Sequence, residues 1–325
     1  GLGPAALYGN TTGDNNVAVG HAALVANTTA SNNTAVGKSA LAANTTGHSN
    51  SAVGQGSLDA NTTGDDNVAV GRLALTANTT GSSNVAIGRD ALEANTTANN
   101  NTAVGTDSLK ANTTGTQNTA IGALAGDAMT TAGGNVGVGY KAMSALTTGG
   151  GNTAVGHQSM ANGVVTGLYN TALGDGSLLV LTSGAENVAV GKDALAANTT
   201  ANNNTAVGTE ALKANTTGVE NTSTGKGSLQ ANTTASYNTA VGSGALGDTT
   251  TGASNTAVGR GALNKNTTAS NNTAVGQSAL GANTTGDSNT GLGVSALQNN
   301  TTGTQNAAVG MNTMRDNTTG LSNSA

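Results

Sequence analysis

The 325-residue chain has no cysteine, tryptophan or phenylalanine, one proline, and only 8% charged residues. Without cysteine it can form neither a disulfide framework nor a thiolate metal site. A net charge of −5 is not the basic footprint of a nucleic-acid-binding protein, so no nucleic-acid partner is expected. The longest aliphatic run, Leu178 to Leu181, is far shorter than the roughly 20 residues that cross a bilayer, so we expect no membrane span in this segment.

What the sequence does contain is a repeat. A glycine recurs every 17 residues from Gly20 to Gly310, apart from one interval of 18 between Gly156 and Gly174. Positions are numbered below from this repeat glycine, which is position 0. Position −1 is valine in 13 of 18 repeats, position −2 is alanine in 15, position −3 is threonine in 11, and position +4 is leucine in 14. A fixed period of this length is typical of stacked identical units.

The repeat predicts an all-β fold. Positions −3 to −1 are short and β-branched and alternate along the chain, which favours a strand. We expect a second short strand over positions +1 to +4, and the remainder, typically Ala-Asn-Thr-Thr-Gly, has the composition of a turn. Each unit contains several Gly, Asn and Thr residues, which have low helix propensity, and its apolar residues do not form the stripe of an amphipathic helix. The fold class is therefore a parallel β-solenoid (a β-roll) with one 17-residue coil per repeat and about 19 coils.

The alternation also predicts which side chains are buried. We expect valine at −1 and leucine at +4 to line the coil interior. Alanine at −2 would then face outward, where a stripe of small residues allows a neighbouring chain to approach. This arrangement favours self-association, as a homotrimer or as a head-to-tail or bundled filament.

We interpret residues 1–325 as a single continuous repeat array. Its last residues, Asn323 to Ala325, begin another unit, so we expect an excerpt of a longer array. Residues 123–186 form an irregular zone that loses the Asn-Thr-Thr element and contains the 18-residue interval. Two interpretations of this zone are open: drift in a degenerate array, or a contact region whose turn face is more apolar.

An asparagine occupies position −4 of every repeat from Gly20 onward. We expect its role to be structural, as a ladder in which each amide bonds its copies in adjacent coils. The members of this column are Asn16, Asn33, Asn50, Asn67, Asn84, Asn101, Asn118, Asn135, Asn152, Asn170, Asn187, Asn204, Asn221, Asn238, Asn255, Asn272, Asn289 and Asn306.

A second asparagine column opens the Asn-Thr-Thr element. Each member is a formal N-glycosylation acceptor in a turn expected to be exposed. The alternative is that Asn and Thr are favourable turn residues and that their repetition creates the sequon as a by-product. The members are Asn10, Asn27, Asn44, Asn61, Asn78, Asn95, Asn112, Asn198, Asn215, Asn232, Asn266, Asn283, Asn300 and Asn317.

Catalytic chemistry has little support. The three histidines, His21, His48 and His157, lie in distant repeats and have no repeated carboxylate or nucleophile beside them. Basic residues recur at position +1 among neutral ones, with acids nearby, which favours a solvated face over a polyanion site. We therefore expect no enzymatic activity and no cofactor or metal ion.

The unit also resembles a known family. Asn-Val-Ala-Val-Gly at 16–20 and 67–71, and Asn-Val-Ala-Ile-Gly at 84–88, are similar to the repeats in the heads of YadA-like trimeric autotransporter adhesins. The longer Asn-Thr-Thr-Gly-x-x-Asn-Thr-Ala-Val-Gly form is also similar to the shafts of phage tail-fibre-like and bacterial surface proteins. The resemblance covers essentially the whole chain, although its period is longer than that of the adhesin heads. It implies a left-handed β-roll, a homotrimer, and an extracellular, cell-surface or virion location.

These observations predict a non-enzymatic structural or adhesive segment of an extracellular fibre, used for attachment or display. Its partners would be further copies of the chain and a host-surface, matrix or glycan ligand. Three alternatives remain open: a glycosylated filament, a phage tail-fibre shaft, and an ice-binding solenoid. The last would need a flat threonine array on a strand.

Overall fold

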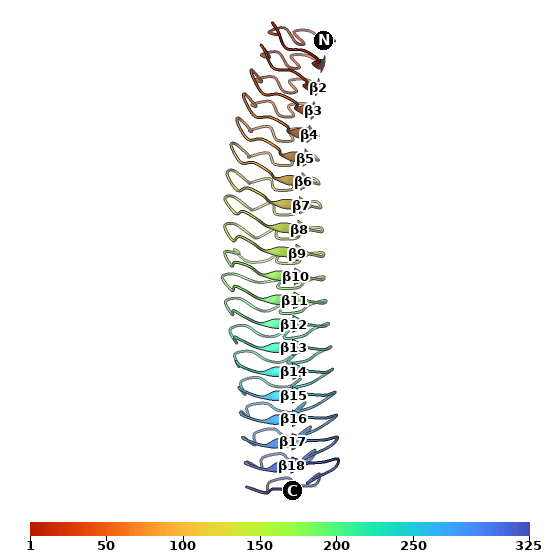
Figure 1. Ribbon diagram of the computed structural model, residues 1–325, viewed down its shortest axis with the longest axis vertical. Helices are drawn as coiled ribbons and strands as arrows, with labels where there is room; N and C mark the ends of the chain where they lie inside the picture. Colours follow the sequence, from red (N-terminus) through yellow and green to blue (C-terminus); the bar gives the residue numbers. More distant parts are fainter. The chain divides into compact units, whose positions relative to one another are not determined.

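The structure is a computed structural model that describes residues 1–325. It is all-β and contains no helix, and every strand has three residues. Two compact units are present, Gly1–Thr166 with strands β1–β9 and Gly167–Ala325 with strands β10–β18. Figure 1 labels the strands from β2 to β18.

The strands of the first unit are β1 (Val17–Val19), β2 (Thr34–Val36), β3 (Ser51–Val53), β4 (Val68–Val70), β5 (Val85–Ile87), β6 (Thr102–Val104), β7 (Thr119–Ile121), β8 (Val136–Val138) and β9 (Thr153–Val155). Those of the second unit are β10 (Thr171–Leu173), β11 (Val188–Val190), β12 (Thr205–Val207), β13 (Thr222–Thr224), β14 (Thr239–Val241), β15 (Thr256–Val258), β16 (Thr273–Val275), β17 (Thr290–Leu292) and β18 (Ala307–Val309).

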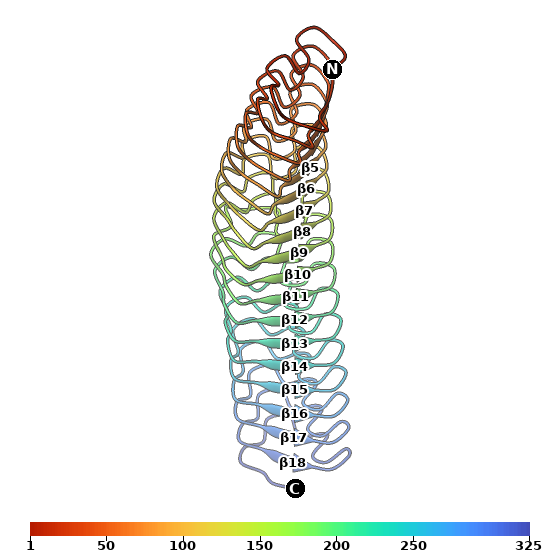
Figure 2. The same ribbon diagram turned by 45° about the horizontal axis from the view of Figure 1, so that its top comes forward.

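Within each unit, every strand pairs in parallel with the next strand along the chain. The register joins equivalent positions, as in Ala18 with Ala35 and Ala206 with Ser223. Each coil leaves its strand, makes a long turn and returns to form the next strand (Figure 2). Equivalent side chains therefore form columns along each unit, one strand spacing apart, or about 4.8 Å. This confirms the parallel β-solenoid with 17-residue coils.

The buried side of the strand is the alanine side, so the expectation for valine and alanine is wrong. Alanines at −2 are at most 2% exposed, whereas valines at −1 face outward: Val53 is 40% exposed and Val241 is 38% exposed. The interior opposite −2 is narrow: a Cβ added to Gly137 would already lie 3.5 Å from the carbonyl oxygen of Ala142. Only a small side chain fits there, alanine in most coils and serine at Ser223, and the leucine at +4 packs beside it.

The second predicted strand is also absent. Positions +1 to +4 form a turn in which +2 and +4 have positive φ, as in Ala22 (55°) and Leu24 (54°). Left-handed residues at alternate positions prevent an extended backbone. The turn still stacks on its neighbours, since the Leu24 N–H donates to the carbonyl oxygen of Ala40 at 3.0 Å. Coils are thus held together around much of their perimeter and not only at the strand.

Candidate functional site

The asparagine at −4 connects adjacent coils from inside the solenoid. The backbone N–H of Asn33 donates to Oδ1 of Asn16 at 2.9 Å, and Nδ2 of Asn33 donates to the carbonyl oxygen of Gly47 at 2.9 Å. Every member from Asn33 to Asn306 is at most 1% exposed, and Asn16 is half-buried. One side chain thus satisfies backbone groups that would otherwise be buried without partners. The column is placed to hold the fold together and is not available to a ligand.

The second asparagine column, at +7, is buried as well, so the expected exposed turn is wrong for it. Nδ2 of Asn44 donates to Oδ1 of Asn27 at 3.0 Å and to the carbonyl oxygen of Gly47 at 2.9 Å. Members with 0% exposure are Asn27, Asn44, Asn61, Asn78, Asn95, Asn112, Asn198, Asn215, Asn232, Asn266, Asn283 and Asn300.

This burial bears directly on glycosylation. A glycan would be attached to Nδ2, and in Asn44 both hydrogens of that nitrogen are already donated. The buried members therefore cannot accept a glycan in the folded chain. Asn10 and Asn317, at the two ends of the column, are half-buried. The burial could not be predicted from the sequence, because Asn-Thr-Thr has the composition of an exposed turn. Whether the asparagine side chain points inward depends on the backbone conformation of the coil.

The surface that each unit presents on its sheet is the outward strand face, which we define as positions −3 and −1 of every strand. Its residues are Thr, Val, Ser, Ala, Ile and Leu, and none is charged. In the second unit, position −3 is threonine in six consecutive strands, from Thr205 to Thr290. Val207, Val241 and Val275 beside them are 37–40% exposed. The face is an uncharged array of hydroxyl and methyl groups in register.

The irregular zone changes the interior of the coils. The four residues that replace asparagine in the second column, Met129, Leu146, Val165 and Leu181, are each at most 1% exposed. In these coils the hydrogen-bonded amide ladder is replaced by a column of apolar side chains inside the solenoid. These four side chains are therefore not part of the surface, whereas Tyr140, Val164, Leu168 and Tyr169 of the same zone are exposed.

Where the +7 asparagine is replaced, the asparagine of the preceding coil loses the hydrogen-bond donor for its side-chain oxygen. In regular coils the +7 asparagine donates to the asparagine of the coil before it, so Oδ1 of Asn112 would need a donor at residue 129, which is methionine. Likewise Oδ1 of Asn232 would need a donor at residue 249, which is threonine. Both oxygens are buried and have no hydrogen-bond partner. A buried acceptor without a partner costs stability.

Charged residues form pairs both within a coil and between neighbouring coils. Lys110 lies 3.0 Å from Asp107, 3.4 Å from Glu93 and 3.8 Å from Asp90. Its hydrogen bond to Asp107 raises the pKa of the Lys110 ammonium. In the second unit, Lys213 and Glu210 are 2.9 Å apart, and this hydrogen bond lowers the pKa of Glu210. Because these cations are paired with acids, they do not form a free basic surface.

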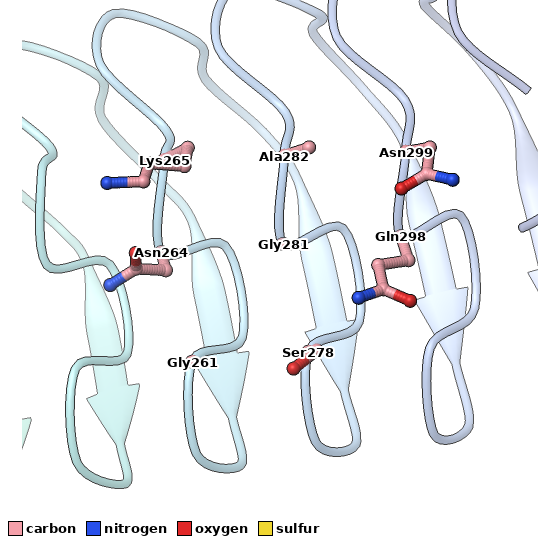
Figure 3. A pocket seen from close by; sticks show the side chains of 8 residues that line it. All are labelled: Gly261, Asn264, Lys265, Ser278, Gly281, Ala282, Gln298 and Asn299. Atoms are coloured by element: carbon pink, nitrogen blue, oxygen red, sulfur yellow. The ribbon is translucent and has the colours of Figure 1, made fainter. Parts of the chain in front are cut away.

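Two shallow hollows lie beside the turn of the second unit. The first, of about 310 Å³, is lined by Gly261, Asn264, Lys265, Ser278, Gly281, Ala282, Gln298 and Asn299 (Figure 3). It forms because Gly261 and Gly281 lack side chains. Nδ2 of Asn264 donates to the carbonyl oxygen of Gly244 at 2.8 Å, and Lys265 pairs with Asp248 at 2.8 Å. In Figure 3 both side chains point away from Gly281 and Ala282.

The second hollow, of about 510 Å³, is lined mainly by aliphatic groups, from Val180, Ala196, Ala197 and Ala214, with Lys213 and Gln230 at its edge. Lys213 is already paired with Glu210. Neither hollow brings together a nucleophile, a base and a third group that orients the base, which is the arrangement that covalent catalysis needs.

The histidines do not meet one another. Nδ1 of His48 accepts a hydrogen bond from the backbone N–H of Ser31 at 3.0 Å. The His157 ring stacks on Tyr140, with ring centroids 5.7 Å apart. The stack could have been predicted from the sequence, because Tyr140 and His157 both stand at position +1, in consecutive coils.

No family model matches the chain, and no curated protein is similar to it. The structure contains no helix that is long and apolar enough to cross a membrane.

Proposed function

We propose that this chain is a non-enzymatic structural or adhesive segment of an extracellular fibre. The observation that carries the proposal is the outward strand face: an uncharged column of Thr and Val, in register from coil to coil within each unit. A fold that is extended by adding equivalent coils suits the role of a spacer or display surface. The stacked asparagine ladders support a mechanical role, because they join each coil to the next through buried hydrogen bonds.

Self-association of the chain, as a homotrimer or bundled filament, forms part of the proposal. The outward strand face is half-exposed and lacks charge, which is the composition of surfaces that pack against a second chain. The proposed location is the cell surface or a virion fibre, with a host-surface, matrix or glycan ligand. Immunogold labelling of intact cells and of virus particles distinguishes the two locations.

The test of self-association is the mass of the chain in solution, measured by light scattering over a range of concentrations. A double variant, Thr239→Lys with Thr256→Lys, places two cations on the outward strand face of β14 and β15. The matched control, Thr234→Lys with Thr251→Lys, places two cations on exposed positions of the preceding turns.

We expect the native chain and the control to be oligomers and the strand-face variant to be a monomer. A native chain that stays monomeric at every concentration contradicts the proposed self-association. Equal loss of assembly in both variants would place the contact elsewhere than on the strand face.

A second candidate function is ice binding, and one observation favours it. The threonines from Thr205 to Thr290 lie on strands and face outward in register, as the threonines of an ice-binding array would. Thermal hysteresis of the native chain tests this candidate. If the strand face binds ice, the native chain and the control variant (Thr234→Lys with Thr251→Lys) should both show thermal hysteresis. The strand-face variant (Thr239→Lys with Thr256→Lys) should show none. Absence of hysteresis in the native chain excludes it.

A further inference from the structure

The one interval of 18 residues places its extra residue in an exposed bulge. Up to Ala161 the regular offset holds, since Oγ of Ser144 donates to the carbonyl oxygen of Ala161, 17 residues later, at 3.1 Å. Beyond it, the N–H of Thr147 donates to the carbonyl oxygen of Val165, 18 residues later. The extra residue therefore lies between these points, in residues 162–164.

The bulge is exposed, and its residues make no hydrogen bond to another coil of the first unit. Asn162, Gly163 and Val164 are all exposed, and the Val164 side chain is 66% accessible. Within the first unit, none of their backbone N–H or C=O groups bonds to the preceding coil. The side chain of Asn162 likewise makes no hydrogen bond.

The bulge also contains the only Asn-Gly pair in the sequence, Asn162-Gly163. Glycine has no side chain to screen its backbone nitrogen, so this nitrogen can approach the preceding side-chain amide closely. From these observations we propose that Asn162 is a site of spontaneous covalent modification, at which its side-chain amide is converted through a cyclic imide to aspartate and isoaspartate. The inference does not rest on the proposed function.

The conversion balances with water as its only co-reactant. The backbone nitrogen of Gly163 attacks Cγ of Asn162, the new C–N bond closes a five-membered imide, and the Cγ–Nδ2 bond breaks. The side-chain nitrogen leaves as ammonia and takes with it the proton of the Gly163 amide. Water then opens the ring at one of its two carbonyl carbons. Opening at Cγ gives aspartate, and opening at the main-chain carbonyl gives isoaspartate, in which the chain runs through Cβ and Cγ.

The fold protects the other asparagines from this reaction. Members of the two ladders are buried and donate from Nδ2, as Asn187 does to Oδ1 of Asn170 at 3.0 Å. An exposed asparagine such as Asn312 is followed by a residue that carries a side chain. Asn162 alone combines exposure, a free amide and a following glycine.

The experiment is peptide mapping by mass spectrometry after incubation of the native chain at mildly alkaline pH. Trypsin releases the segment between Lys141 and Lys192, which contains Asn162 together with the buried Asn152, Asn170 and Asn187 as internal controls. We expect the mass change of amide-to-acid conversion, and the isoaspartate product, at Asn162 only. Hydroxylamine, which cleaves the imide, should split the chain into residues 1–162 and 163–325.

Two variants complete the test. Asn162→Gln lengthens the side chain by one methylene and should abolish both the product and the cleavage, with circular dichroism confirming an unchanged fold. Gly163→Ser adds a side chain beside the attacking nitrogen and should slow the reaction. No product at Asn162, or product at the buried asparagines at an equal rate, overturns the proposal.

Discussion

Met129 takes the place that a leucine side chain occupies in other coils, and Gly126 makes room for it. A Cβ added to Gly126 would lie 3.0 Å from Cε and 3.2 Å from Sδ of Met129. Gly126 stands at position +4, where leucine is usual, and Met129 stands at +7, where asparagine is usual. The two exceptions to the repeat therefore compensate each other within one coil.

This compensation predicts strong coupling between the two residues. Gly126→Leu alone should overpack the coil, and Met129→Asn alone should leave a void, so each should destabilise the first unit by about 1–3 kcal/mol. The double variant restores the usual coil and supplies a donor for Oδ1 of Asn112. We expect a favourable coupling energy of about 1–3 kcal/mol, measured by a double-mutant cycle of chemical denaturation. Additive effects would show that the two side chains do not share the space.

Thr249→Asn should stabilise the second unit. An asparagine at residue 249 would donate from Nδ2 to the unpartnered Oδ1 of Asn232, in the pattern of Asn232 with Asn215 at 2.8 Å. The expected gain is about 1 kcal/mol, measured as a higher denaturation midpoint. The reverse change, Asn215→Thr, introduces the same interruption into a regular coil and should lower the midpoint. A loss of stability in Thr249→Asn would contradict the assignment.

Gly276→Ala should be among the most damaging single substitutions. Gly276 has φ +133°, and an added Cβ would clash with the carbonyl oxygen of Gly293 in the next coil. We expect a loss of at least about 2 kcal/mol, seen as a lower melting temperature.

The control for Gly276→Ala is Gly261→Ser in the preceding coil. Gly261 has φ +65°, and its added Cβ would meet only Oγ of Ser278, at 3.8 Å. Ser278 itself already adopts φ 56° at the equivalent position. Because serine is tolerated there, the control should change the melting temperature little. Equal damage in both variants would argue against the special role of the repeat glycine.

Asp127 should make the stability of the first unit depend on pH. Burial, the largest cause, raises the pKa of its carboxyl, and its Oδ1 is buried without a hydrogen-bond partner. A raised pKa in the folded chain means that the folded state binds the proton more tightly than the unfolded state does. Its contribution is therefore fully present below the unfolded pKa, about 3.9, and is lost as pH rises through the folded pKa.

Asp127→Asn removes this titration. The variant should be more stable than the native chain at neutral pH, and the difference should shrink as the pH falls through the folded pKa. Melting curves between acid and neutral pH check this, and Asp59→Asn should act in the same direction because burial also raises the pKa of Asp59. A difference that is constant with pH would contradict the prediction.

The sequence predicted the fold class because the 17-residue period and the short β-branched run are visible without coordinates. It did not predict which side of the strand is buried, because Val-Ala-Val and Thr-Ala-Val are compatible with either direction. The choice depends on the width of the interior, which is set by the turn opposite. The left-handed leucines, such as Leu24 at φ 54°, could not be predicted either, because leucine disfavours that region and is held there by stacking and burial.

The amides of the +7 column all point the same way. Nδ2 of Asn78 donates back to Asn61, and Nδ2 of Asn61 donates back to Asn44, so each C=O faces the next coil along the chain. Their dipoles add, and each uninterrupted run carries a positive pole toward its N-terminal end and a negative pole toward its C-terminal end. Asn112 and Asn232 mark two of the negative poles. A cation placed in the coil after either residue should therefore be held more strongly than one placed in the coil before the run begins.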